Sequence, residues 1–321
     1  MSGFQLSDPG SLADRDPAVA EYLHSYDFPQ PAEARYGFLR LESPGGRNRV
    51  ALFGQAWVPG HATGTVLLLH GYSEHSGNYA RLVREFVQSQ LALITMDFRG
   101  HGLSEGPIGH VDGPSTYAED AEHLVASIFA QVLPYRPLYL WGHSMGGMVG
   151  LQLLLRGKLP AEVKAAVYSS PLLGFPELKG PQKALAALSP FLAKLVPTLP
   201  VSHGVPPNDL SHDKDYLEKR AKDPLIKRVT TPRWFESTKA TVQEVQIGAE
   251  RLHAGTPTLL MLAGDERVTN LAQARSFAFR AYAGQRHKVI EFPATFHELE
   301  KEPAVRPRLL SESLAWFRSH P

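Results

Sequence analysis

The sequence of 321 residues contains no cysteine. Disulfide bonds, thiolate zinc sites, iron–sulfur clusters and cysteine nucleophiles are therefore excluded, because each of them requires a thiol. The absence does not assign a redox compartment, since a chain without thiols suits reducing and oxidising surroundings alike. A nucleophile in this chain must be a residue other than cysteine.

The sequence also has little excess charge and no long apolar run. Its 33 basic and 32 acidic side chains leave a net charge of +1, whereas nucleic-acid-binding domains present a basic face. No window approaches the roughly 18 consecutive apolar residues of a membrane span. The N-terminus has neither a basic start nor an apolar core, so no secretory signal is predicted. We expect a cytoplasmic protein that does not bind nucleic acid.

Short apolar runs alternate with helix-length segments along most of the chain. Runs at 35–42 and 48–58 flank the turn sequence SPGG at 43–46 and predict a β-hairpin. Six further strands are expected at 65–70, 91–98, 137–142, 163–170, 258–263 and 288–292, with helices at 78–89, 117–132, 144–156, 271–283 and 307–318. Such alternation predicts an α/β fold, in which helices cover both faces of a mostly parallel sheet of eight strands.

Residues 172–235 interrupt this alternation. They contain nine prolines, several short helical stretches and no clear strand, so they are too broken to form an independent domain. We therefore expect one core, made of residues 35–171 and 236–321, with 172–235 inserted between its two parts. Residues 1–34 show little periodicity and are expected to form an arm that wraps around the core.

The sequence GHSMG at 142–146 fits the pattern G-x-S-x-G. It follows the predicted strand 137–142 and begins the predicted helix 144–156, the context in which this pattern forms a sharp turn that exposes the serine. The glycines are needed because the turn is strained and closely packed. The N-terminus of the helix favours negative charge that develops above it. We therefore predict that Ser144 is a nucleophile rather than part of an ordinary helix-capping turn.

A serine hydroxyl needs a base, and the base needs a carboxylate to orient it. Of the fourteen histidines, His297 fits best, because it lies in a loop just after the strand 288–292. The strand 258–263 leads into two adjacent carboxylates, Asp265 and Glu266. Neighbouring side chains in a turn point in different directions, so only one of the two can meet the imidazole.

Two backbone amides are expected to stabilise an oxyanion at this serine. Met145, directly after the nucleophile, supplies one of them in this type of turn. Tyr72 is expected to supply the other, because Gly71 lets the chain turn that amide toward Ser144. The same loop also contains three potential metal ligands, His70, Glu74 and His75. Their spacing is not that of a regular helical metal motif, so we predict neither a metal nor a cofactor.

Several motifs resemble those of a known family. They are HGYSEHSGNY at 70–79, DFRGHGLSEG at 97–106, GHSMGG at 142–147, SSPLL at 169–173, DPL at 223–225 and FHELEKE at 296–302. From about residue 35 to the C-terminus the chain resembles the monoacylglycerol lipase and lysophospholipase branch of the α/β-hydrolases, which is classed with the serine aminopeptidases. The resemblance implies that Ser144 is the nucleophile, His297 the base, and the amides of Tyr72 and Met145 the oxyanion hole.

The acid is where the chain departs from this family. Its members usually read G-x-x-D-R, with the aspartate nine residues after the proline that starts the strand. Counting nine residues from Pro257 reaches Glu266, which is followed by the expected Arg267. Asp265 has the usual side chain but lies one residue early. The register therefore favours Glu266 as the acid.

The resemblance further implies that residues 172–235 form a helical cap, or lid, over the nucleophile. The stretch 183–200 carries a mostly apolar face. That face either packs onto the core or roofs an acyl-binding site, and the resemblance favours the roof. An apolar roof of this kind predicts transient contact with a membrane surface through the cap.

These observations predict a serine hydrolase that cleaves the carboxylic esters of lipids through an acyl-enzyme, as a monoacylglycerol lipase or a lysophospholipase. The substrate is then a small lipid ester, and no cofactor takes part. A small-ester carboxylesterase or an aminopeptidase on the same fold is one alternative. A catalytically silent α/β-hydrolase that serves as a binding module is another, although such proteins usually lack a member of the triad.

Overall fold

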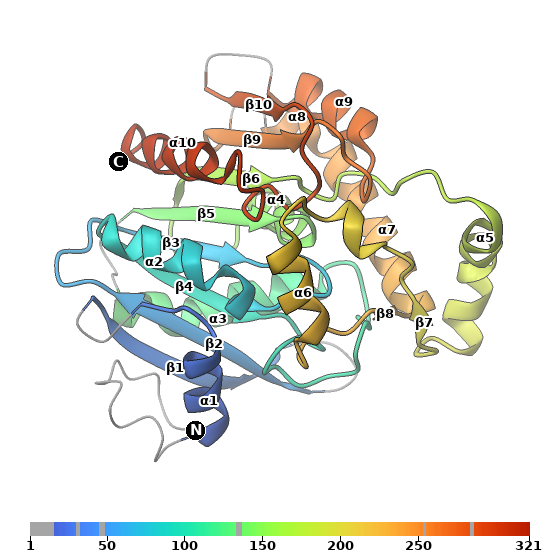
Figure 1. The fold of residues 1–321 in the computed structure, drawn as a ribbon, viewed down its shortest axis with the longest axis horizontal. Helices are drawn as coiled ribbons and strands as arrows, with labels where there is room; N and C mark the ends of the chain where they lie inside the picture. Colours follow the sequence, from blue (N-terminus) through green and yellow to red (C-terminus); the bar gives the residue numbers. More distant parts are fainter. Residues whose placement is uncertain (1–15, 30–32, 45–48, 133–136, 253–254, 283–285) are drawn as a thin grey trace.

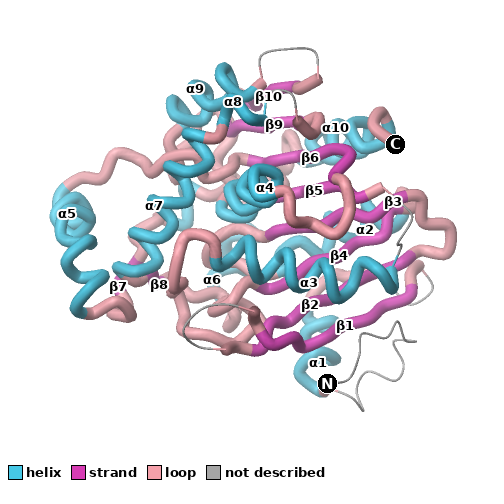
Figure 2. The backbone as a smooth tube through the Cα atoms, turned by 180° about the vertical axis from the view of Figure 1, so that it is seen from behind, coloured by secondary structure: helices cyan, strands magenta, loops and turns pink. Residues whose placement is uncertain are grey.

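The computed structural model describes residues 16–29, 33–44, 49–132, 137–252, 255–282 and 286–321 (Figure 1). Parts of the expected N-terminal arm, 1–15 and 30–32, lie outside the described residues, as do 45–46 of the expected turn. Between these gaps the described chain forms a single layered arrangement of a sheet with helices on both sides (Figures 1 and 2).

Eight strands form the central sheet, which confirms the predicted fold class. They are β1 (Arg35–Glu42), β2 (Ala51–Val58), β3 (Gly64–Leu69), β4 (Leu91–Asp97), β5 (Leu138–His143), β6 (Val163–Ser169), β9 (Thr258–Ala263) and β10 (Lys288–Phe292). Their order is β1-β2-β4-β3-β5-β6-β9-β10. The pairs β1–β2 and β2–β4 are antiparallel, and every other pair of neighbouring strands in this sheet is parallel. Every residue of β3, β4 and β5 is buried, as expected for strands covered on both faces.

Helices divide between the two faces of the sheet. One face carries α1 (Pro17–Ser25), α2 (Ala80–Gln88) and α10 (Arg306–Arg318), and the other carries α3 (Thr116–Val132), α4 (Met145–Arg156) and α9 (Leu271–Ala281). Each face has its own apolar core, with Phe86 and Phe317 in the first and Leu124 and Phe277 in the second. Burying both faces of the sheet is the main source of stability in such folds.

The helix α1 was not expected from the sequence. Asp16 caps it by accepting hydrogen bonds from the amides of Ala18 and Val19, a common way to begin a helix. Only Val19 and Tyr22 of its nine residues are buried, so it lacks the repeating apolar stripe by which helices are recognised. Its stability depends on the surface it covers, which sequence periodicity does not report.

The chain between β6 and β9 extends to one side of the sheet (Figure 1). It forms α5 (Gly180–Leu195), β7 (Val201–Ser202), η3 (Pro207–Asp209), α6 (Lys214–Lys222), β8 (Val229–Thr230), α7 (Pro232–Ile247) and α8 (Ala249–Leu252). The two short strands β7 and β8 pair with each other, although no strand was expected here. Helix α7 begins before residue 235 and ends after it, so the expected boundary between insertion and core falls inside one helix. Among the described residues no helix is both long and apolar enough to cross a membrane.

Candidate active site

Ser144 occupies the turn between β5 and α4. Its φ of 49° and ψ of −115° are strained for a residue with a Cβ atom. A Cβ atom at Gly146 would lie 2.1 Å from the carbonyl oxygen of Leu69, and one at Gly142 would lie 2.7 Å from that of Gly146. Both distances are shorter than Cβ atoms show to other heavy atoms in real structures, so packing requires the two glycines of the motif. The turn that the motif predicts is therefore present.

His297 and Glu266 complete a series of hydrogen bonds that starts at Ser144. Nε2 of His297 lies 2.9 Å from Oγ of Ser144, and its Nδ1 lies 2.8 Å from Oε2 of Glu266. The other carboxylate oxygen of Glu266 accepts hydrogen bonds from the amides of Val268 and Thr269. An ionised carboxylate only accepts, so Nδ1 carries a proton and Nε2 is free to accept the serine hydroxyl. This geometry is that of a nucleophile, a base and an orienting acid.

The pKa shifts of Glu266 and His297 are consistent with these roles as acid and base. Burial disfavours charge on both side chains, but the attraction and hydrogen bond between them outweigh it. The pKa of Glu266 is therefore lowered and the pKa of His297 is raised. The carboxylate is thus ionised at neutral pH and stabilises the positive charge that the imidazole acquires when it takes a proton.

Asp265 points away from this series. Its side chain is 45% exposed, and its Oδ2 lies 2.6 Å from a guanidinium nitrogen of Arg267. The adjacent residue Glu266 is turned inward, where its side chain is 3% exposed. Of the two carboxylates that the sequence left open, the structure brings only Glu266 to the imidazole.

The residues of the two expected oxyanion donors lie in the turn of the serine and in the loop after β3. Met145 is the first residue of α4, where amides have no acceptor within the helix. Tyr72 lies in the loop after β3 and lines the same cavity as Ser144. Its hydroxyl donates to the carbonyl of Val229 over 2.7 Å, and its ring lies 3.9 Å from that of Trp234, centroid to centroid. The side chain of Tyr72 thereby ties the loop to the segment between β6 and α7.

The three potential metal ligands of this loop have separate partners. Nε2 of His70 accepts from the amide of Phe98, and His75 lies 3.0 Å from a carboxylate oxygen of Asp223. Glu74 accepts from the amide of Gly71 and from Tyr79. Within the ranges that the structure describes, no group of three or more histidine or carboxylate side chains is arranged to hold a metal ion.

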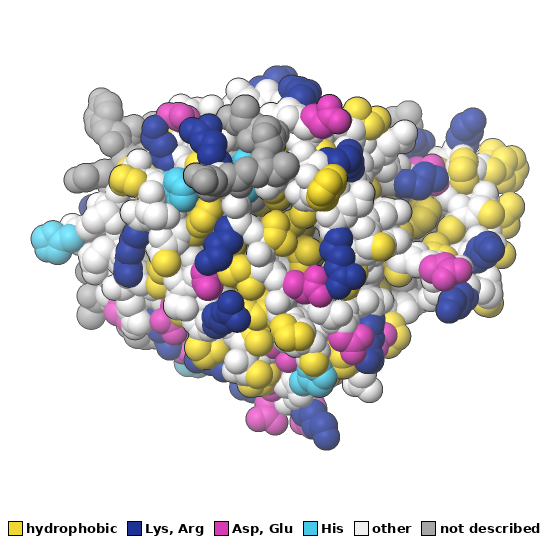
Figure 3. All heavy atoms as spheres, turned by 90° about the horizontal axis from the view of Figure 1, so that it is seen from above, with side chains coloured by type: hydrophobic (Ala, Val, Ile, Leu, Met, Phe, Trp, Pro, Cys, Tyr) yellow, Lys and Arg dark blue, Asp and Glu magenta, His cyan; other side chains and the backbone are white. Residues whose placement is uncertain are grey.

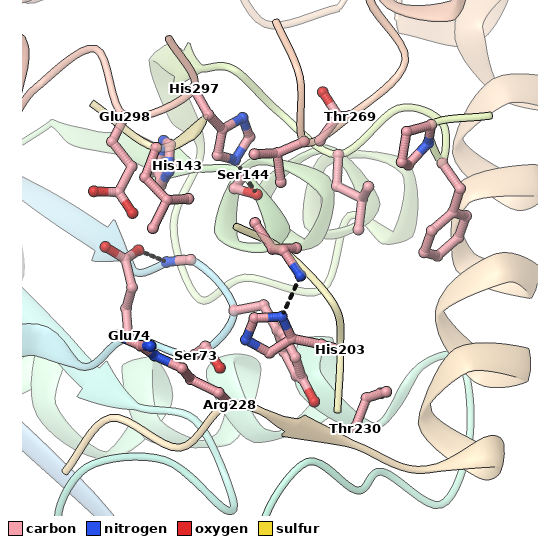
Figure 4. A pocket seen from close by; sticks show the side chains of 18 of the residues that line it. Ser73, Glu74, His143, Ser144, His203, Arg228, Thr230, Thr269, His297 and Glu298 are labelled. Carbon is pink, nitrogen blue, oxygen red and sulfur yellow. Dashed lines mark hydrogen bonds between the residues drawn. The ribbon is translucent and has the colours of Figure 1, made fainter. Parts of the chain in front are cut away.

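Ser144 opens into a cavity of about 160 Å³ that is lined by both apolar and polar residues. The apolar part is lined by Leu172, Phe175, Pro176, Leu178, Val205, Leu210, Trp234, Phe235 and Val268. The polar part is lined by Ser73, Glu74, His203, Arg220, Arg228, Thr230 and Glu298. In Figure 4, Ser144 and His297 lie on one side of the cavity, and Ser73 and His203 lie across from them. Apolar walls with a few convergent polar groups are typical of sites for small amphipathic ligands.

Two buried carboxylates stand out in the polar part. Glu74 and Glu298 are each 2% exposed, and they lie next to each other in Figure 4. Oε1 of Glu74 and Oε2 of Glu298 have no hydrogen-bond partner among the described residues. Burial, together with the charge of Glu298, raises the pKa of Glu74. Sequence reasoning did not single out Glu298, although its place directly after His297 in the motif FHELEKE was a usable signal.

Comparison with known proteins gives a consistent result. Residues 60–304 match the family model described as serine aminopeptidase, S33. A monoacylglycerol lipase of Mycolicibacterium smegmatis is 30% identical over 266 residues, which cover 82% of this chain and 91% of the relative. Phospholipase YtpA of Bacillus subtilis is 26% identical over 247 residues, which cover 77% of this chain and 92% of the relative.

A solved structure agrees with these sequence relatives. The crystal structure of the Paleococcus ferrophilus monoacylglycerol lipase matches with a TM-score of 0.71 at 25% identity, and the match covers 84% of this chain and 99% of that one. The family match spans most of the chain and includes the serine, the acid and the histidine. The chain therefore belongs to the serine aminopeptidase S33 family of the α/β-hydrolases.

Proposed function

We propose that the chain is a serine hydrolase that cleaves the carboxylic esters of lipids. The observation that carries this proposal is the hydrogen-bonded series Ser144–His297–Glu266 at the edge of a largely apolar cavity. Two relatives, a monoacylglycerol lipase and a phospholipase, are named for activity on lipids. A monoacylglycerol lipase or a lysophospholipase is the activity that fits both observations.

The reaction follows from the geometry. Oγ of Ser144 attacks the ester carbonyl carbon while Nε2 of His297 takes its proton. The amides of Tyr72 and Met145 bind the oxyanion, and losing one such donor typically costs about 3–4 kcal/mol of transition-state stabilisation. His297 then protonates the departing alcohol oxygen as the carbon–oxygen bond breaks. Water, activated by the same imidazole, attacks the acyl-enzyme and releases the fatty acid.

The polar part of the cavity favours a glycerol headgroup over a phosphate. Glu74 and Glu298 offer two buried acceptor oxygens without partners, which suit the hydroxyl donors of glycerol. A phosphate would meet these two acidic groups at close range, and among the described residues the one lining cation outside the Arg220–Glu298 pair is Arg228. Arg220 donates to the carbonyl of Ser73 and lies 3.6 Å from Glu298, so it is already engaged. Burial lowers the pKa of His203 to about 4, so this ring adds no positive charge at neutral pH.

Residues 172–235, extended by the rest of α7, are proposed to act as the cap. Apolar side chains of α5 and the turn after it are exposed, namely Leu188, Phe191, Leu195, Val196 and Leu199. Figure 3 shows apolar side chains gathered at the end of the molecule that α5 forms in Figure 1. Exposed apolar groups on one helix are a common means of lipid contact. The cap is therefore proposed to touch the membrane surface from which the substrate is taken.

A substrate panel tests this function by varying the headgroup on a constant oleoyl chain and the acyl chain on a constant p-nitrophenyl group. Monooleoylglycerol, oleoyl lysophosphatidylcholine, p-nitrophenyl oleate and p-nitrophenyl acetate separate the headgroup from the acyl chain. We expect the highest kcat/KM for monooleoylglycerol, a lower value for the lysophospholipid and the lowest for the acetate. A preference for p-nitrophenyl acetate, or for the lysophospholipid, would contradict the acyl-chain or the headgroup part of the proposal respectively.

An aminopeptidase is the second candidate, because the two buried carboxylates also suit the ammonium group of an amino-acid substrate. Hydrolysis of aminoacyl p-nitroanilides at a higher kcat/KM than monooleoylglycerol would favour it. Labelling of Ser144 by a fluorophosphonate distinguishes both enzymes from a silent binding module. A folded wild-type chain that resists this label would exclude all of the hydrolases.

A further inference from the structure

The hydroxyls of Tyr22 in α1 and of Tyr26, directly after this helix, meet at a single histidine of the loop after β3. Oη of Tyr22 lies 3.1 Å from Nδ1 of His75, and Oη of Tyr26 lies 3.1 Å from Nε2 of the same ring. Tyr22 and His75 are 3% and 0% exposed. Helix α1 precedes residues 60–304, which match the family model, so these contacts come from a segment that the family match does not include.

The His75 ring also joins the loop to the segment that follows α6. Its Nε2 lies 3.0 Å from Oδ2 of Asp223, and Tyr26 donates to the same oxygen over 2.7 Å. Burial disfavours charge on Asp223, but the hydrogen bonds from His75 and Tyr26 outweigh it and lower the pKa of Asp223 to about 2. The carboxylate is therefore ionised at neutral pH and accepts hydrogen bonds from both side chains.

The same loop has three more ties to α6 and the segment that follows it. Tyr72 donates to the carbonyl of Val229, and Ser73 donates to that of Lys227. Arg220 donates in turn to the carbonyl of Ser73 over 3.0 Å. Ser73 has a φ of 56°, a conformation that residues other than glycine adopt only where their surroundings hold them. The shape of the loop therefore depends on partners that are distant in sequence.

We propose that Tyr22 and Tyr26 are positioning residues, which fix the His75 ring and thereby hold the Tyr72 amide in place for the oxyanion. The inference rests on the proposed function, because only acyl transfer at Ser144 gives that amide an oxyanion to bind. The two hydroxyls add to a ring that the loop and Asp223 also hold, since Nδ1 of His75 accepts from the amide of Gly77 and Nε2 lies 3.0 Å from Oδ2 of Asp223. With all four partners in place the His75 ring cannot turn, and it restrains the backbone three residues before it. A displacement of about 1 Å at a catalytic group can cost on the order of 100-fold in rate.

The competing interpretation is that the two tyrosines only fill space. Their rings do pack closely: the Tyr22 centroid lies 4.9 Å from that of Tyr26 and 5.9 Å from that of Phe53. Substitution by phenylalanine separates the two interpretations, because it keeps the rings and removes only the hydroxyls. A packing role then predicts unchanged turnover, whereas a positioning role predicts slower turnover with intact substrate binding.

The test is the double variant Tyr22→Phe/Tyr26→Phe, with Tyr139→Phe as the matched control. Tyr139 lies on the same face of the sheet, is 4% exposed and stacks on Phe317, far from the loop in the fold. For monooleoylglycerol we expect kcat of the double variant to fall at least about tenfold while KM changes less than about twofold. The inhibition constant of an oleoyl trifluoromethyl ketone, whose adduct carries an oxyanion, should rise by the same factor. The control should change neither quantity.

Hydrogen exchange of residues 71–77 and 223–230 provides a second measurement on the folded proteins, and we expect it to accelerate in the double variant only. If the double variant does not fold, Tyr26→Phe alone should show the same changes at reduced size. Unchanged kcat and inhibition constant in an active, folded variant would overturn the positioning role while leaving the proposed function intact. A wild-type chain that hydrolyses none of the esters would overturn the proposed function and, with it, this inference.

Discussion

The loops at the ends of the strands and the segment between β6 and α7 differ in which side chains they bury. The loops bury polar side chains, whereas the segment exposes apolar ones. In the loops, the side chains of His297 and Glu266 are each 3% exposed, and their polar atoms have hydrogen-bond partners. On α5, Leu188, Phe191 and Leu195 are 56%, 62% and 64% exposed. The first region is fixed in position, and the second leaves apolar surface in water.

This difference indicates that the two regions have separate functions, one in chemistry and the other in lipid contact. Groups that transfer protons must be held within a fraction of an ångström, which a buried parallel sheet provides. Several exposed apolar side chains gathered on one helix mark an interaction surface, such as one for lipid. Variants in the first region should therefore affect chemistry, and variants in the second should affect lipid contact alone.

The sharpest test of the first region is Ser144→Ala. We expect kcat to fall by roughly 10⁶-fold, because the imidazole and the acid have no role without the nucleophile. Thermal stability should change little, and the loss should be equal for monooleoylglycerol and p-nitrophenyl esters.

Ser170→Ala is the matched control for this variant. Ser170 is also a buried serine with a left-handed φ, 42°, but it makes no contact with His297 among the described hydrogen bonds. Its activity should stay within a few-fold of wild type. Comparable losses in both variants would indicate that the turn is merely sensitive to substitution.

Comparing Glu266→Gln with Asp265→Asn tests which of two adjacent carboxylates in the first region orients His297. The first substitution removes the charge beside Nδ1 of His297, and losing the orienting carboxylate of such a triad typically lowers kcat by about 10⁴-fold. The second alters an exposed ion pair with Arg267 and should change kcat by less than about threefold. Steady-state kinetics on one ester suffice. The reverse order of effects would identify Asp265 as the acid.

The choice between these two carboxylates shows where sequence reasoning ends. Both are acids in one turn, so residue type does not separate them, and only the count from Pro257 favoured Glu266. What turns Glu266 inward is a pair of hydrogen bonds from the amides of Val268 and Thr269. The strands, by contrast, were predictable because their burial on two faces produces continuous apolar runs.

Features that depend on distant partners were missed for the same reason. Tyr22 is recognisable as buried only once the loop around His75 is folded beneath α1. Helix α7 was missed in part because its buried face includes the polar side chains Ser237, Thr238 and Thr241 and therefore forms no simple apolar stripe. Local pattern therefore predicts the sheet and the serine turn, whereas contacts between remote segments decide the rest of the site.

The second region is tested by replacing Leu188, Phe191 and Leu195 of α5 with serine. We expect binding to phosphatidylcholine vesicles to weaken at least about tenfold, because each buried apolar side chain contributes about 1.5–3 kcal/mol. The kcat/KM for p-nitrophenyl butyrate in solution should not change. Co-sedimentation with vesicles measures the first quantity, and an absorbance assay measures the second.

Phe279→Ser is the control for a general effect of surface hydrophobicity. Phe279 is 82% exposed but lies on α9, outside the segment between β6 and α7. Vesicle binding should be unaffected in this variant. If it weakens as much as in the α5 variant, the assignment of lipid contact to α5 is wrong.

The pH dependence of kcat/KM gives the smallest expected effect. It again tests whether the catalytic loops and α5 act independently. The base must be neutral to accept the proton of Ser144, so activity rises as pH rises through the pKa of His297. Burial lowers that pKa, but Glu266, with smaller contributions from Glu298 and Glu300, raises it above its ordinary value. In Glu266→Gln the main raising interaction is lost, so the acid limb of the residual activity should move to lower pH. The α5 variant should keep the wild-type limb, since the three replaced side chains are uncharged and exposed to solvent. An acid limb that moves upward in Glu266→Gln would contradict the role of Glu266 in raising the pKa of His297. A limb that shifts in the α5 variant would show that the chemistry and the lipid-contacting helix are not separate.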